Sequence, residues 1–269
     1  MVGTISIWVY VIHKEGNQRL HVHFLSVGQG DAAFIESPTG TQMLIDGGSN
    51  GALLRELSQV MPFYDRSIDV VVATHPDFDH IGGLIEVMKR YEVGMLLVSF
   101  PANDTDVDER LISIAKEKGV FIKAPLRGSD LDLGAGVHAT ILFPDRELDH
   151  IETNTASLVL QLRYGKTAFM FTGDSPDEIE EYLVTLDGKR LESDVLKLGH
   201  HGSRTSTSEL FLGFVSPDYA VISAGKDNSY GHPHEEVLEK IAAFGIQKKD
   251  TLSGMVSFQS DGTTVFATN

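Results

Sequence analysis

Strand-like runs alternate with single helical segments in both halves of the chain, and this alternation constrains the fold more than any other feature. The first half opens with "LHVHFLSV", "DAAFIES" and "TQMLIDG", which predict three strands joined by turns at residues 28–30 and 38–40. A helix is predicted over residues 52–60, where leucines recur at helical spacing. The next run, "IDVVVAT" (residues 68–74), is continuous and rich in β-branched residues, which is typical of a strand buried on both faces.

The same alternation continues to the C-terminus. "SLVLQLRY" and "TAFMFTGD" flank Gly165 and Lys166, and a two-residue turn with glycine first predicts a type II′ hairpin. The remaining predicted elements are helix 83–91, strand "GMLLVSF", helix "DERLISIAKEKG", strand "VFIKA", helix 177–186, strand "SDVLKLG", helix "STSELFLGFV", strand "YAVISAG", helix "PHEEVLEKIAAFG" and a final hairpin turning at Asp261–Gly262. Two sheets packed face to face with helices outside satisfy this pattern, so we expect an α/β fold of the αββα four-layer sandwich type.

The chain organisation is simple, because no repeat or linker-like stretch divides the sequence. We expect one main domain over residues 20–269, preceded by a separate segment over residues 1–19. That segment contains "ISIWVYVI", an apolar run much shorter than the roughly 20 residues a membrane span needs. Two interpretations stay open for it: a β-strand, or the remnant of a membrane anchor.

Composition narrows the range of functions. The formal net charge is −16 over 269 residues, so nucleic acid would have to be bound through local positive charge or metal ions, because bulk attraction is excluded. There is no cysteine, which excludes disulfides and thiolate metal sites.

Four groups able to bind metal are crowded into "THPDFDH", directly after the run at 68–74. Strand ends deliver side chains to loops on a rigid frame. His75, Asp77 and Asp79 alternate and can point the same way, while His80 can reach over from the following helix. We expect one metal ion to take His75 and Asp77, and a second to take Asp79 and His80.

Three other predicted strands also end in polar loops. "FMFTGDSP" places Asp174 at a strand end, where its two oxygens could bridge two cations. "KLGHHGSRTS" places His200 and His201 after another strand, followed by Ser203 and Arg204, which are donors suited to phosphate.

The last of these loops, "SAGKDNSYGHPH", carries Lys226 and His232. We expect Lys226 to contact substrate and His232 to have a role in the active site. The turn "VGQGD" is followed by a strand and not by a helix, so it is no phosphate loop; it is expected to bring Asp31 near the site.

Taken together, "VGQGD", "IDGG", "THPDFDHIGG", "FTGD", "LKLGHHGS" and "YGHP" resemble motifs of the metallo-β-lactamase superfamily, in particular the branch that includes the extramembrane domain of the DNA-uptake protein ComEC. The resemblance covers about residues 20 to 260, nearly the whole chain. The resemblance implies an αββα sandwich and a two-metal hydrolase. It implies that Asp46 supports the ligands from behind, that Asp174 bridges the metals, and that the late histidine ligand is His201, with His200 as the alternative. It also matches the four-residue cluster His75, Asp77, Asp79 and His80 to metal ligands.

Two positions depart from the wider superfamily. Asp77 stands where a histidine is usual, and "ETNTAS" occupies the region of a further histidine, with Asn154 at the matching position. A first metal site richer in oxygen shifts preference from zinc toward manganese or magnesium. We therefore expect two divalent metal ions, zinc or manganese.

The favoured function is hydrolysis of a phosphodiester in DNA by a metal-activated water. Asp79 would orient the nucleophile, and His200 or His232 would stabilise the transition state or protonate the leaving oxygen. Two alternatives stay open: hydrolysis of a small phosphoester, lactone or thioester, and a non-catalytic domain that binds DNA or a partner. The expected partners are nucleic acid or another phosphodiester and a membrane-associated uptake apparatus. The outer face of the cytoplasmic membrane or secretion is favoured, with the cytoplasm and the oligomeric state left open.

Overall fold

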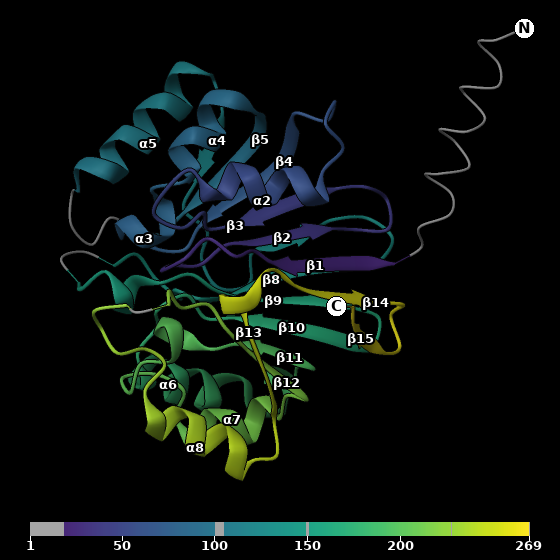
Figure 1. Cartoon of the computed structure of the whole chain (residues 1–269), viewed down its shortest axis with the longest axis vertical. Coiled ribbons are helices and arrows are strands. Elements are labelled where there is room, and N and C mark those ends of the chain that lie inside the picture. The colour runs from purple at the N-terminus through teal and green to yellow at the C-terminus, as the bar shows by residue number, and fades with distance from the viewer. Residues whose placement is uncertain (1–18, 100–104, 149–150, 227, 269) are drawn as a thin grey trace, which may run out of the picture.

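Two β-sheets stacked face to face form the centre of the protein, and helices cover the outer face of each (Figure 1). The computed structural model describes residues 19–99, 105–148, 151–226 and 228–268. The predicted αββα four-layer sandwich is therefore confirmed. The segment 1–19, interpreted from sequence as a strand or an anchor remnant, lies outside the described residues except for its last position.

The first sheet has eight strands in the order β15-β14-β1-β2-β3-β4-β5-β6, and the second has seven in the order β13-β12-β11-β10-β9-β8-β7. Neighbours from β3 to β6 run parallel, as do those from β10 to β13, while the remaining pairs are antiparallel. The strands are β1 (Leu20–Phe24), β2 (Ala33–Glu36), β3 (Gln42–Ile45), β4 (Ser67–Ala73), β5 (Glu92–Val98), β6 (Phe121–Lys123), β7 (Asp130–Asp132), β8 (Val137–Phe143), β9 (Val159–Tyr164), β10 (Thr167–Phe171), β11 (Val195–Lys197), β12 (Tyr219–Ile222), β13 (Gln247–Asp250), β14 (Val256–Ser260) and β15 (Val265–Ala267).

Helices flank the sheets in two groups (Figure 1). The first sheet is accompanied by α2 (Ala52–Val60), α3 (Phe78–Ile81), α4 (Leu84–Arg90) and α5 (Asp106–Glu117), and the second by α6 (Asp177–Asp187), α7 (Glu209–Val215) and α8 (Glu235–Ala243). Single 3-10 turns lie at η1 (Asn154–Ala156), η2 (Gly188–Leu191), η3 (Gly199–Gly202) and η4 (Thr251–Ser253). The part of the chain that the structure describes has no helix long and apolar enough to cross a bilayer.

Three apolar cores separate the four layers. Phe24, Phe169 and Phe258 lie in the core between the two sheets, with ring centroids 5.9 and 6.2 Å apart for the two pairs that include Phe258. A second core packs beneath α2, α4 and α5, and a third beneath α6, α7 and α8. Strand β4 belongs to two of these cores, because Val70 and Val72 face the other sheet while Val71 and Ala73 face the helices. Its continuous apolar sequence therefore reflects burial on both faces, as predicted.

Candidate metal centre

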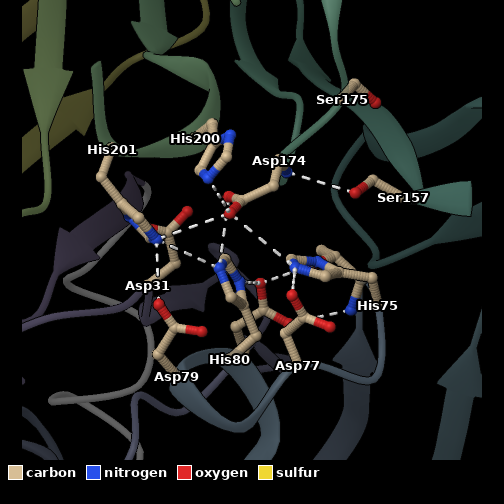
Figure 2. Close-up of polar contacts among 12 residues, drawn as sticks. Asp31, His75, Asp77, Asp79, His80, Ser157, Asp174, Ser175, His200 and His201 are labelled. Carbon is tan, nitrogen blue, oxygen red and sulfur yellow. Dashed lines mark hydrogen bonds and ion pairs between the residues drawn. The ribbon is translucent and has the colours of Figure 1, made fainter. Parts of the chain in front are cut away.

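Four strands deliver polar side chains to one edge of the sandwich, where the two sheets meet (Figure 2). The turn after β3 carries Asp46, the loop after β4 carries His75, the loop after β10 carries Asp174, and η3 after β11 carries His201. The parallel arrangement of β3 with β4, and of β10 with β11, brings these loops to the same edges of their sheets. Ligands from both halves of the chain therefore converge on a single point.

Asp174 lies at the centre of the group (Figure 2). Its Oδ1 is 3.2 Å from Nε2 of His80, and its Oδ2 is 3.8 Å from Nε2 of His75 and 3.6 Å from Nε2 of His201. Oδ2 is also 3.7 Å from Nε2 of His200. The carboxylate is almost fully buried, so its charge is weakly screened by solvent.

The two aspartates of the "HPDFDH" stretch contact different histidines of this centre. Asp77 Oδ2 is 3.7 Å from Nε2 of His75, and Asp79 Oδ2 is 3.4 Å from Nε2 of His201. Burial raises the pKa of Asp77, which a hydrogen bond from Thr153 opposes. Both carboxylates are partly exposed, so they form the mouth of the site while the imidazoles form its floor.

Two buried carboxylates hold the histidines from behind. Asp46 Oδ2 is 2.8 Å from Nδ1 of His80, and Asp31 Oδ1 is 3.0 Å from Nδ1 of His201. A carboxylate that accepts the Nδ1–H bond fixes the orientation of the ring, so each Nε2 is directed at Asp174. This is the orientation that a metal-binding imidazole requires.

Asp46 is itself held in place by Thr74. The Thr74 amide and hydroxyl donate to the two Asp46 oxygens at 2.8 and 2.7 Å. Asp46 adopts a φ of +57°, a left-handed conformation that is uncommon outside glycine. His200 and His201 also have positive φ, of +47° and +56°. Backbone strain of this kind clusters at functional sites.

Besides His201, a buried lysine contacts Asp31, and sequence reasoning did not identify it. Lys197 is buried in β11, and its Nζ lies 2.8 Å from Asp31 Oδ1 and 2.9 Å from the carbonyl of Leu198. Although burial raises the pKa of Asp31, Lys197 and His201 outweigh it, and the pKa falls below its ordinary range. Asp31 is therefore an ionised acceptor for His201.

The site attracts positive charge. Burial lowers the pKa of His201, but Asp174 and Asp31 outweigh that effect and raise it to about 9. The pKa of His80 also rises well above its usual value, because Asp174 and Asp46 outweigh burial. His75 differs: burial and the neighbouring His80 lower its pKa to about 4, so it is neutral at pH 7.

These residues fit a bound divalent cation. One ligand atom from each of Asp31, His80, Asp174 and His201 lies within 4.8 Å of the others. Within the described residues, His75 Nε2 is buried without a hydrogen-bond partner, although such atoms are normally paired. Imidazole Nε2 atoms thus face carboxylate oxygens, an arrangement that a cation between them would stabilise.

The remaining predicted site residues lie in η1 and in the loops after β11 and β12. His200 is partly exposed, and its ring lies 5.3 Å from that of His232. Ser203 Oγ is 3.0 Å from Thr205 Oγ1, and Arg204 is exposed, with Nε 3.7 Å from Glu236. Lys226 is exposed in the loop after β12. Asn154 lies in η1, one residue after the Thr153 that contacts Asp77, and its Oδ1 is buried without a hydrogen-bond partner among the described residues.

Sequence reasoning missed four residues that support the site: Thr74, Thr153, Ser157 and Lys197. Ser157 Oγ accepts a hydrogen bond from the Asp174 amide at 3.2 Å, which fixes the turn that carries Asp174. Hydroxyls within strands and loops carry no distinguishing pattern. Lys197 gave a signal, because a lysine inside the apolar run "SDVLKLG" requires a buried partner.

Comparison with known proteins agrees with this geometry. The family model for the metallo-beta-lactamase superfamily matches residues 25–226, and the chain belongs to that superfamily. The resemblance noted from its motifs is confirmed, and the chain carries a candidate metal site.

The relatives include competence proteins. The chain is 32% identical over 243 residues to the ComE operon protein 3 of Bacillus subtilis (strain 168), covering 84% of this chain and 31% of that protein. It is 37% identical over 194 residues to the Competence protein ComA of Neisseria gonorrhoeae, covering 72% of this chain and 25% of that protein. The chain thus spans less than a third of the length of either relative.

Solved structures share the fold. CmlA, a diiron beta-hydroxylase from Streptomyces venezuelae, superposes with a TM-score of 0.58 at 15% identity, over 88% of this chain and 53% of that chain. Zn(2+)-bound PqqB from Methylobacterium extorquens gives a TM-score of 0.56 at 11% identity, over 86% of this chain and 97% of that chain. At this identity the likeness concerns the fold alone.

Proposed function

We propose that the protein is a metal-dependent phosphodiesterase that cleaves DNA, using two divalent cations, zinc or manganese. One observation carries the proposal: three buried imidazoles converge on Asp174 with their Nε2 atoms 3.2–3.8 Å from its oxygens. Asp77 and Asp79 stand on either side of that group. The donor set divides into His75 with Asp77 and His80 with Asp79 and His201, and Asp174 contacts both sets.

Each residue then has a task. Divalent cations held by this donor set supply a nucleophile at neutral pH and neutralise charge on a phosphate. Asp31 and Asp46 keep the Nε2 atoms of His201 and His80 aimed at the centre. Asp79, at the exposed mouth, orients the attacking water through its carboxylate.

His232 is the residue proposed to contact the leaving oxygen. Burial and the imidazoles of His200, His201 and His234 lower the pKa of His232 to about 4. His232 is therefore neutral at pH 7 and acts as a hydrogen-bond donor to the leaving oxygen. Ser203, Arg204 and Lys226 contact the phosphates, which offsets the repulsion expected from a chain of net charge −16.

Nucleic acid is favoured as substrate because the relatives include a Recombination protein 2 from Haemophilus influenzae, at 32% identity over 241 residues, besides the competence proteins. The donor set also favours a phosphodiester over a β-lactam, because Asp77 and Asn154 make it richer in oxygen. Because the relatives include competence proteins, we also propose that the protein works with a DNA-uptake apparatus at the outer face of the cytoplasmic membrane.

The test is hydrolysis of a model phosphodiester and of DNA by the double variant His75→Ala/Asp174→Ala, assayed with manganese and with zinc. A drop of at least 100-fold is expected, since removing ligands of this kind removes the cation site. The matched control is His138→Ala/Asp130→Ala, an exposed histidine–aspartate pair 2.8 Å apart on β7 and β8, outside the site. Undiminished hydrolysis in the first variant would end the proposal. If the protein hydrolyses a small phosphoester or lactone but does not cleave DNA, the small ester replaces DNA as the proposed substrate.

A further inference from the structure

Two large apolar side chains stand exposed beside the metal centre. Phe78 is 59% exposed although it lies in α3 between Asp77 and Asp79. Tyr230 is 65% exposed in the loop that leads to His232. The first ring belongs to the half of the chain that forms the first sheet, and the second to the half that forms the other, so the two rings approach the site from different halves.

Phe78 is held in a defined position. A Cβ atom on Gly82 would lie 2.9 Å from Cε2 of Phe78, so the ring rests against the backbone of Gly82. The other apolar residue of α3, Ile81, is buried in the core beneath the helices. The single turn of α3 therefore directs one apolar side chain inward and presents the other to solvent, directly beside two of the proposed ligands.

Tyr230 continues a series of rings that leads away from the centre. Its ring is stacked on His232 with centroids 5.7 Å apart and an interplanar angle of 23°, and His232 lies 5.3 Å from His200. One face of the Tyr230 ring is thus covered by an imidazole, and its exposure leaves the other face open to solvent.

The loop that carries Tyr230 is braced. Asn228 donates to the carbonyls of Gly225 and His232 at 2.9 and 2.6 Å and accepts from the His232 amide at 3.0 Å. The Gly225 amide donates to Gln29 Oε1 at 3.0 Å, which ties the loop to the other half of the chain. A ring on a braced loop loses little conformational entropy when a ligand stacks on it.

From this placement we propose that Phe78 and Tyr230 are stacking platforms for unpaired bases of the substrate, so that the enzyme acts on single-stranded nucleic acid. This inference rests on the proposed phosphodiesterase function and names its substrate class. Aromatic rings bind bases of any sequence, because every base has a π-face, and each stacked base contributes about 1–3 kcal/mol. In a duplex those faces are covered by neighbouring base pairs, so these rings would select a strand with exposed bases.

Stacking also answers the charge problem of an acidic protein. Arg204 and Lys226 are exposed near the site, but the net charge of −16 works against a long electrostatic contact with phosphates. Affinity drawn from ring surfaces does not depend on that charge. We therefore expect the affinity for a single strand to fall less steeply with salt than it does for proteins that bind phosphates alone.

The experiment compares three labelled oligonucleotides of one length: a single strand, the same backbone without bases, and a duplex. Dissociation constants are measured by fluorescence anisotropy with manganese present, and all three oligonucleotides carry phosphorothioate backbones, which resist hydrolysis. The wild-type protein is expected to bind the single strand roughly 100-fold more tightly than the abasic strand, a factor of about ten for each stacked base. Phe78→Ala and Tyr230→Ala should each lose about tenfold for the single strand, and the double variant should bind both strands equally.

Two controls separate stacking from a change in structure. Phe121→Ala removes a ring of equal exposure, 59%, on the edge strand β6, and should keep the full preference for bases. Tyr230→Trp keeps a stacking surface and should also keep it. Equal binding of single strand and abasic strand by the wild type, equal binding of duplex and single strand, or an unchanged double variant would each overturn the inference. Hydrolysis of a base-free phosphodiester by the wild type tests the proposed function separately.

Discussion

Replacing Lys197 by methionine is the sharpest perturbation of the support beneath the metal centre. Lys197 is buried, and its ammonium group contacts one carboxylate, that of Asp31, at 2.8 Å. The same Asp31 oxygen receives the Nδ1–H of His201 at 3.0 Å. Methionine fills a similar volume but leaves the Asp31 charge buried with one partner fewer, so the substitution isolates the electrostatic part of the contact.

The expected loss is large. Removing one partner of a buried ion pair destabilises a protein by roughly 3–5 kcal/mol, because the remaining charge is uncompensated. For a chain of this size each kcal/mol lowers Tm by roughly 2–4 °C, so a fall on the order of 10 °C is expected. The residue that loses orientation is His201, and losing such support lowers metal affinity roughly 10–100-fold.

The assay is a double-mutant cycle. Urea unfolding is measured for the wild type, Lys197→Met, Asp31→Asn and the double variant, together with manganese affinity. The double variant should be less destabilised than the sum of the singles, with a coupling energy of roughly 2 kcal/mol. Lys248→Met is the control, because its contact with Asp250, at 3.5 Å, is partly exposed and should contribute at most about 1 kcal/mol. Additive losses within about 0.5 kcal/mol would refute the reasoning.

Two further substitutions test other parts of the structure. Burial raises the pKa of Glu180 to about 7, against the opposing hydrogen bonds from the amides of Ser208 and Thr207. The folded state therefore holds a proton that the unfolded state releases near pH 4.5. The free energy of unfolding of the wild type, relative to that of Glu180→Gln, should fall by roughly 3 kcal/mol between pH 4.5 and 7, as measured by urea unfolding. A difference between the two proteins that does not change with pH would contradict this. Gly83→Ala would place a Cβ 2.0 Å from the Gly47 carbonyl oxygen and should lower the free energy of unfolding by about 1–3 kcal/mol. Gly51→Ala, where an added Cβ would meet nothing within 4 Å, should leave it nearly unchanged. Equal melting temperatures for the two variants would contradict the packing argument.

Periodicity predicted most of the fold. The helix expected over 52–60 is α2 with the same bounds, and Leu53 and Leu57 lie on its buried face. The hairpin at Gly165 is as predicted, with φ of +57° at glycine and no positive φ at Lys166. Strands β7, β8 and β13 were not predicted. β7 (DLD) and β13 (QKKD) are edge strands of three and four residues, too short and too polar to show the apolar alternation of a strand.

The site was less accessible to sequence reasoning, although the structure brings its main predicted residues together. Strand ends identify His75, Asp174 and His201 as neighbours, because parallel strands share an edge. Which nitrogen of each histidine faces the centre depends on contacts across the chain, such as that between Asp31 and His201, separated by 170 residues. The helical turn α3 was also missed, since its four residues are too few to show a period.

The division of the centre between the two halves has a consequence for how the protein matures. Asp46, His75 and His80 follow strands β3 and β4 of the first sheet, whereas Asp174 and His201 follow β10 and β11 of the second, later in the chain. A chain synthesised only to residue 150 would carry part of the proposed ligand set and would lack the central carboxylate of Asp174. Hydrolysis would then begin only when the second sheet docks on the first. An activity assay would therefore follow this docking step during folding.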